Sequence, residues 1–176
     1  MLTRAPRGMS LIEILIVLSI CGIAVVQGVP AMAGYLASSR IRTAAEGYSN
    51  GIAQARAEAV RLNTNVEFLV SAGRWQVRRV VDSAVLHQAA GMEAGNEVST
   101  TVTPTSATRV TFDQMGRIIA TSPVDGTSAI RQVDFDVSYG AGLGTGRRAL
   151  RVLVQTGGAV KTCDPLVSNT DPRACA

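Results

Sequence analysis

Histidine and cysteine are scarce in this chain of 176 residues, which holds one histidine and three cysteines. Metal sites and catalytic triads bring such residues together in small sets. His87, in the strand-like stretch 85–87, has no paired carboxylate or nucleophile close to it in the sequence, and no Cys-x-x-Cys pair occurs. The sequence therefore indicates no enzyme, no metal site and no cofactor.

Charged residues are few as well, at 17% of the chain, and basic residues only slightly outnumber acidic ones. The formal charge of +4 comes from 17 Lys+Arg against 13 Asp+Glu, and two of the basic residues, Arg4 and Arg7, precede the first apolar run. Net charge alone is thus a weak argument for a nucleic-acid partner. The Gly-rich segment 140–146 lies between two expected strands and lacks the Lys-Ser/Thr of a P-loop, so it does not indicate a nucleotide site.

A long apolar run is what the sequence does have, because residues 11–29 contain a single charged side chain, Glu13. As an α-helix this run would be about as long as the hydrocarbon core of a membrane is thick. Arg4 and Arg7 precede it and no acidic residue does, so we expect the N-terminus in the cytoplasm and the rest exported. A cleaved secretory signal is the alternative, but no clear Ala-x-Ala-like site follows the run.

Glu13 is the residue of this run that indicates function. A carboxylate at the centre of a membrane span costs about 3 kcal/mol on insertion scales, and less toward an interface. Such a charge needs a close cation, and the alternative is a carboxylate that simply lies among the lipid headgroups.

Residues 7–13, which read RGMSLIE and continue into the apolar run, resemble the type III signal of type IV prepilins and pseudopilins. The resemblance implies that a prepilin peptidase cuts after Gly8 and methylates the new amine of Met9, although Phe is the common residue there. It also implies that Glu13 pairs with the N-terminal amine of a neighbouring subunit in a filament.

Pro30 ends the apolar run, and because proline removes one helical hydrogen bond, we expect a kink or local melting there. A simple bend at the membrane boundary is the alternative. Beyond Pro30, apolar residues recur every three or four positions, as on one face of a helix that reaches Leu62. That predicted face consists of Ile41, Ala45, Tyr48, Ile52, Ala55, Ala59 and Leu62.

After Asn63 the apolar period changes to two, which predicts strands. Residues 65–70 and 74–81 are expected to form a hairpin, and residues 131–138 and 147–155 an antiparallel pair. That pair would place Asp134 and Asp136 close to Arg147 and Arg151. Residues 92–106 are polar and are expected to form a loop or an edge.

Cys163 and Cys175 flank the C-terminal tail, and we expect a disulfide between them, which would close a short loop and indicate an oxidising compartment such as the periplasm. Two unpaired cysteines are the alternative. Cys21 stands alone in the apolar run and is expected to pack as a small hydrophobe.

The head segment 111–117, TFDQMGR, followed by a late strand, the turn Thr156-Gly157-Gly158 and Cys163, resembles the GspH/FimT family of minor pilins and pseudopilins. Some competence-associated members of that family bind DNA through a Gly-Arg-x-Arg motif before the last cysteine. The matching positions here read Gly158-Ala159-Val160-Lys161, so the first arginine is absent and a lysine replaces the second. The basic residues that could contact DNA are Arg117, Arg147, Arg148 and Lys161.

Together these observations predict an α+β protein in which a long N-terminal helix packs on an antiparallel β-sheet head. The expected parts are a cleaved leader (1–8), a membrane or filament-core helix (9–30), an amphipathic helix (31–63) and a periplasmic head (64–176). The expected function is that of a minor pilin in a type IV pilus, at its tip or in its initiation complex. The alternatives are a type II secretion pseudopilin and a DNA-binding pilus subunit. The expected partners are other pilins, the prepilin peptidase, the inner membrane and its assembly platform.

Overall fold

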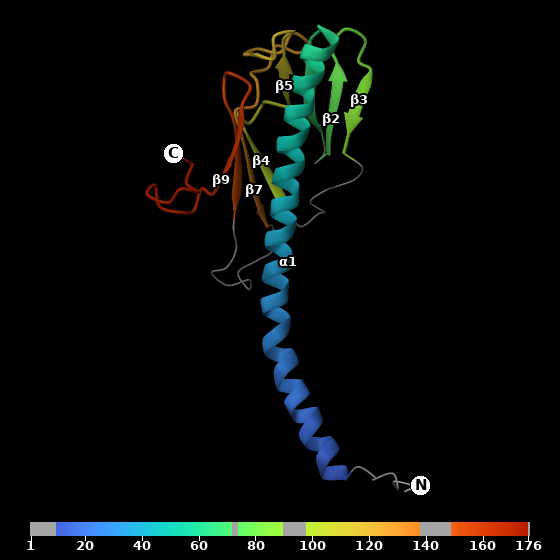
Figure 1. Ribbon diagram of the computed structural model, residues 1–176, viewed down its shortest axis with the longest axis vertical. Helices are drawn as coiled ribbons and strands as arrows, with labels where there is room; N and C mark the ends of the chain where they lie inside the picture. The colour runs from blue at the N-terminus through green and yellow to red at the C-terminus, as the bar shows by residue number, and fades with distance from the viewer. Residues whose placement is uncertain (1–9, 72–73, 90–97, 138–148, 176) are drawn as a thin grey trace, which may run out of the picture.

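One long helix carries the whole head near its C-terminal end (Figure 1). The computed structural model describes residues 10–71, 74–89, 98–137 and 149–175, without the side chains of residues 27–31, 33 and 137. Helix α1 spans Leu11–Leu62, and its N-terminal half projects away from the head. The helix ends where Asn63 adopts a left-handed conformation (φ 48°) and its N–H bonds back to the carbonyl oxygens of the last turn, a common way to close a helix.

The first sheet follows the helix directly and has the order β3-β2-β1-β5-β6. Its strands are β1 (Val66–Ser71), β2 (Arg74–Arg79), β3 (Val85–Gln88), β5 (Arg109–Phe112) and β6 (Ile118–Ile119). Strands β1 and β2 form the predicted hairpin, in which Phe68 is opposite Val77. The predicted second strand of this hairpin extended to residue 81, but β2 ends at Arg79, because residues 80–84 turn into β3.

The second sheet has the order β4-β7-β8-β9. Its strands are β4 (Val98–Thr103), β7 (Gln132–Val137), β8 (Leu150–Val154) and β9 (Val160–Cys163). All strand pairs in both sheets are antiparallel. Residues 92–106 were predicted to form a loop or an edge. The prediction of a loop was wrong for β4, which is a full strand because it pairs with β7 along six positions. It is, as the second alternative expected, an edge strand.

The core lies between the amphipathic half of α1 and the two sheets, and Tyr48 joins all three. Its ring packs edge to face against Phe68 of the first sheet at 5.7 Å and against Phe135 of the second at 5.0 Å. Six of the seven residues on the predicted apolar face of α1 are buried, and Leu62 is partly exposed. The helix is therefore fixed to the head by the stripe that the sequence predicted.

Candidate assembly site

The N-terminal half of α1 exposes an apolar surface on all sides. From Leu11 to Val26 every side chain is exposed, although eleven of them are large and apolar. A continuous apolar surface of this kind on a protein chain marks a site of contact with a partner or a lipid phase. Within the described part of the chain, no helix has the combined length and hydropathy of a membrane crossing.

Glu13 lies in the first turn of this exposed helix. Leu11, Ile12, Ile14 and Leu15 surround it in the sequence and are all exposed. The first-turn amides carry the positive end of the helix dipole, which favours a carboxylate at this position. Gly8 and Met9, the predicted cleavage and methylation positions, lie outside the described residues. Pro30 lies within the bounds of α1, but its side chain is outside the description, so the predicted kink stays a prediction.

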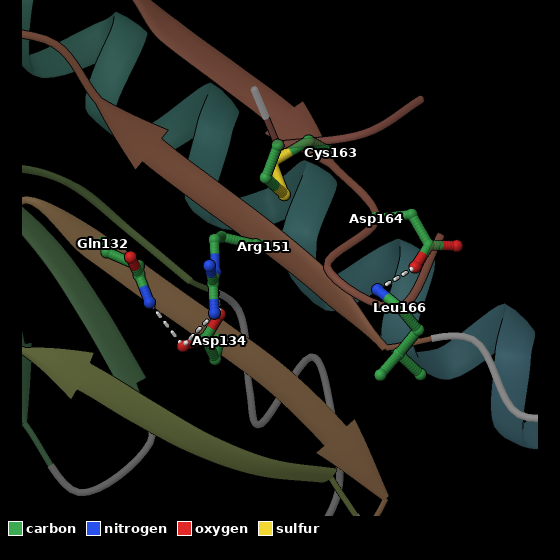
Figure 2. Close-up of a disulfide and its surroundings, with 7 residues drawn as sticks. Gln132, Asp134, Arg151, Cys163, Asp164 and Leu166 are labelled. Atoms are coloured by element: carbon green, nitrogen blue, oxygen red, sulfur yellow. Dashed lines mark hydrogen bonds and ion pairs between the residues drawn. A yellow bond between two sulfur atoms is a disulfide. The ribbon is translucent and has the colours of Figure 1, made fainter. Parts of the chain in front are cut away.

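A disulfide joins Cys163 to Cys175, as the spacing predicted, with an S–S length of 2.09 Å. Figure 2 shows this bond at the end of β9, beside the first residues of the C-terminal loop. Asp164 starts the loop by accepting a hydrogen bond from the Leu166 N–H at 2.9 Å, and its own N–H donates to the Arg173 carbonyl. The disulfide thus ties the C-terminal tail to β9, at the edge of the second sheet. Cys21 is exposed on the projecting helix, so the expectation that it packs as a small hydrophobe stays a prediction.

The predicted pairing of Asp134 with Arg151 is confirmed. The two side chains lie on neighbouring strands β7 and β8, at 2.6 Å between Nε and Oδ1, and Gln132 also donates to Asp134 (Figure 2). Arg147 lies outside the described residues, as does the Gly-rich segment 140–146.

Arg56 connects the two sheets to α1 at a place where two turns meet. Its Nε donates to the Gly116 carbonyl in the β5–β6 turn at 3.0 Å. Gly158, in the β8–β9 turn, lies so close that a Cβ there would be 2.7 Å from that same carbonyl oxygen and 3.2 Å from Arg56 Nε. Both glycines have positive φ, 72° and 80°, which other residues rarely adopt. The family-like segments 111–117 and 156–158 therefore pack against each other.

Of the four residues considered for DNA contact, the structure describes two, Arg117 and Lys161. Arg117 is exposed, but its guanidinium binds Asp113 at 2.9 Å. Hydrogen bonds from the Arg117 backbone N–H and side chain and from the Met115 N–H hold the pKa of Asp113 below its usual value. Lys161 is exposed on β9, and Arg147 and Arg148 lie outside the described residues.

A buried ion-pair network was not predicted. Glu67 of β1 is 1% exposed and binds the guanidiniums of Arg78 and Arg109, the latter at 3.0 Å. Arg109 also binds Asp125 at 2.8 Å. The Thr127 hydroxyl, together with other hydrogen bonds and Arg109, lowers the pKa of Asp125 to about 2. Because side chains alternate along a strand, Glu67 lies on the face of the first sheet that points away from the core. The guanidiniums of Arg78 on β2 and Arg109 on β5 cover it there. The only sequence signal was an acid among arginines on neighbouring strands.

Residues 44–158 match the protein family described as type II transport protein GspH. The match covers more than half of the chain. The chain belongs to the GspH family. The match includes the buried stripe of α1 except Ile41, both sheets except β9, and the two turns at Arg56. A search of curated proteins finds no match. Membership in this family agrees with the resemblance that the head segments suggested.

The fold is also that of a solved pilin. The type IV minor pilin FimU of Pseudomonas aeruginosa strain PAO1, in space group P21, superposes with a TM-score of 0.50 and 16% identity over 78% of this chain and 96% of FimU. A crystal of FimU in space group P65 gives a TM-score of 0.47 and 16% identity over 77% of this chain and 99% of FimU. At this identity the likeness shows the fold, a helix packed on antiparallel sheets.

Proposed function

We propose that this GspH-family chain is a minor pilin or pseudopilin, a structural subunit that enters a filament through the exposed half of α1. The observation that carries the proposal is the apolar surface from Leu11 to Val26, which no other part of the described chain covers. In this proposal the prepilin peptidase removes residues 1–8, and Met9 becomes the methylated N-terminus. The helix then anchors the chain once in the inner membrane, with the head in the periplasm, until the assembly platform adds it to the filament.

Glu13 supplies the specific contact of this assembly. Removing water from a carboxylate costs several kcal/mol unless a cation and hydrogen bonds compensate it. The free amine of a neighbouring processed subunit would provide that cation within the helix bundle. The pair therefore sets the axial position of one helix relative to the next, while the apolar side chains around it supply most of the buried area.

The test is Glu13→Ala in the full-length chain, expressed in its native host. We expect normal membrane insertion and normal removal of the leader, but incorporation into sheared filaments lower by at least about tenfold, because the neighbour's amine would be left buried without its partner. Glu46→Ala is the matched control, since Glu46 is exposed on the same helix and contacts only Arg42 at 2.8 Å in the described structure. Incorporation of the Glu13 variant at the control level would refute the pairing.

Two filaments remain as candidates, and each has one observation in its favour. The family description names type II transport, and the solved fold is that of a type IV minor pilin. Deletion of the gene separates them: loss of surface pili with normal protein secretion supports the pilus, and the reverse supports the pseudopilus.

A further inference from the structure

Strand β4 forms a long, uncharged edge of the second sheet. It pairs with β7 over six positions without a register shift, and no described segment pairs with its other side. Its sequence, Val98–Thr103, holds no charged residue and no proline. Natural proteins usually protect such an edge with a charge, a proline, a bulge or a covering segment, because unpaired backbone groups attract another strand.

The other three sheet edges in the described chain carry such protection. Strand β3 has four residues and a register shift against β2 between Val77 and Arg78. Strand β6 has only two residues. At β9 the C-terminal tail returns to the end of the strand, where Asp164 bridges Ala174 and the disulfide closes the loop. The contrast indicates that the β4 edge is left open for a partner.

The backbone groups that β4 offers at this edge follow from its pairing with β7. The Val154 N–H of β8 donates to the Arg131 carbonyl at 2.8 Å, so β7 bonds to β8 through alternate residues from 131 onward and to β4 through the residues between them. Those residues pair with the odd-numbered positions of β4. The N–H and C=O groups of the even-numbered positions, Val98, Thr100 and Val102, therefore point to the free edge.

The core-facing side of β4 is incompletely covered at this edge. Thr100 pairs with Phe135 and Val102 with Val133, so both lie on the core-facing side of the sheet. Phe135 and Val133 are fully buried, whereas Thr100 and Val102 are partly exposed. A strand added beside β4 would cover them, and apolar side chains on that face of the strand would extend the core. The outward side chains of β4 are all Ser or Thr, so polar residues fit opposite them.

We infer that β4 accepts an extended strand, apolar at alternate positions, from a different subunit of the filament. Adding a strand to a sheet edge is a recurrent way to bind a peptide segment, with main-chain hydrogen bonds for affinity and alternate side chains for specificity. Strand β7 runs toward the end of the head from which α1 projects, so the antiparallel β4 begins at that end (Figure 1). The edge therefore begins where a subunit packed on residues 11–26 would reach it.

The occupant is a different subunit and not a second copy of this chain. Contacts along a filament join two different surfaces, so the β4 edge of one copy cannot pair with the β4 edge of the next. The other edges described in this chain are short, bulged or covered by the tail, so a second copy offers no free strand of matching length. The inference rests on the proposed function and names the kind of partner that this function places beside the chain.

A proline substitution tests the edge without breaking the sheet. Thr100→Pro removes an N–H that points away from β7, and proline is tolerated at such edge positions. We expect an unchanged unfolding temperature of the head, and incorporation into sheared filaments lower by at least about fivefold because the partner strand loses a main-chain hydrogen bond. Gln88→Pro is the matched control. The Ala89 N–H donates to the Trp75 carbonyl of β2, so by alternation the Gln88 N–H points away from β2, and the control should enter filaments normally.

Incorporation of the unchanged chain is measured first, so that the two ideas fail separately. If the unchanged chain does not enter filaments, the proposed function fails and the inferred contact fails with it. If it enters and Thr100→Pro enters equally well, the inference is overturned and the proposed function stands. A Thr100→Pro head that does not fold also overturns the inference, because the Thr100 N–H would then bond within the chain.

Photo-crosslinking identifies the partner strand directly. A benzophenone amino acid in place of Thr101, which is exposed on β4, is introduced into the full-length chain. In sheared filaments it should crosslink to a different pilin-like subunit, at a segment with apolar residues at alternate positions. The same probe at Thr162, exposed on β9, should give none of that product above background. A crosslink within the same chain, to a second copy or to an exported protein would overturn the inference.

Discussion

The two halves of α1 have the same secondary structure and opposite relations to the rest of the chain. Residues 11–26 are exposed on all sides, whereas residues 41–59 bury a stripe of apolar side chains against both sheets. The first half is rich in Ile and Val, whose branched side chains lower helix propensity slightly, and no other described segment packs on it to compensate. The second half owes its stability to packing. The comparison teaches that one helix can serve two tasks when its apolar residues are arranged around it in one half and along one stripe in the other.

The largest contrast should come from equal substitutions in the two halves. Ile52→Ala, at a fully buried position, should lower the free energy of unfolding of the head by about 2 to 5 kcal/mol, because it removes packed methylenes and leaves a cavity. Ile16→Ala, at an exposed position, should leave head unfolding unchanged while it weakens filament incorporation. Chemical denaturation followed by tryptophan fluorescence measures head unfolding in both variants, since Trp75 lies in the head core. The amount of each variant in sheared filaments measures incorporation. Equal stability losses would mean that the two halves are not energetically separate.

Glycine substitutions sharpen the same contrast at a smaller scale. Alanine in place of a helical glycine favours the helix by up to about 1 kcal/mol. At Gly51, however, a Cβ would be 2.7 Å from a Phe68 ring carbon and 3.0 Å from Trp75, so Gly51→Ala should destabilise the head by about 1 to 3 kcal/mol.

Gly34→Ala is the control for this prediction, because nothing lies within 4 Å of the position a Cβ would take there. It should leave the stability of the head unchanged or slightly higher. A stable Gly51→Ala head in the same denaturation measurement would show that the Phe68 and Trp75 rings can move aside.

The smallest expected effect is on pH dependence near the end of α1. A hydrogen bond from Arg61, with a further one from His87, lowers the pKa of Glu58. Its stabilising contribution is therefore complete above the ordinary carboxyl pKa and is lost as the pH falls through the lower folded value. Replacing Glu58 with Gln should slightly flatten the loss of thermal stability on acidification below about pH 4. An unchanged slope in the Glu58→Gln head would contradict this assignment.

Periodic patterns made the packed half of α1 and the β1–β2 hairpin predictable. Steps of three and four residues identified the stripe from Ile41 to Ala59, and the change to a period of two identified the hairpin that carries the buried Phe68, Trp75 and Val77. The pairing of Asp134 with Arg151 followed from the same alternation on adjacent strands. These patterns are local, so they can be read from a short stretch of sequence without knowledge of long-range contacts.

Other features depend on contacts between distant segments and left no periodic signal. Strand β4 is rich in Thr and polar, and it is a strand because β7 pairs with it. Glu67 is buried because arginines on two other strands cover it. The role of Glu13 could be proposed from the sequence, by contrast, because a single charge in an apolar run is costly unless it is paired.

The contact between Arg56, Gly116 and Gly158 has a consequence for how relatives of this chain are classified. Gly158 needs its small size and its positive φ to fit against the Gly116 carbonyl, whatever the head binds. A glycine at this turn is thus a requirement of folding, and its presence in a homologue carries no information on DNA uptake. A difference between a DNA-binding subunit and a purely structural one is therefore expected at the positions after this glycine, here Ala159 and Lys161.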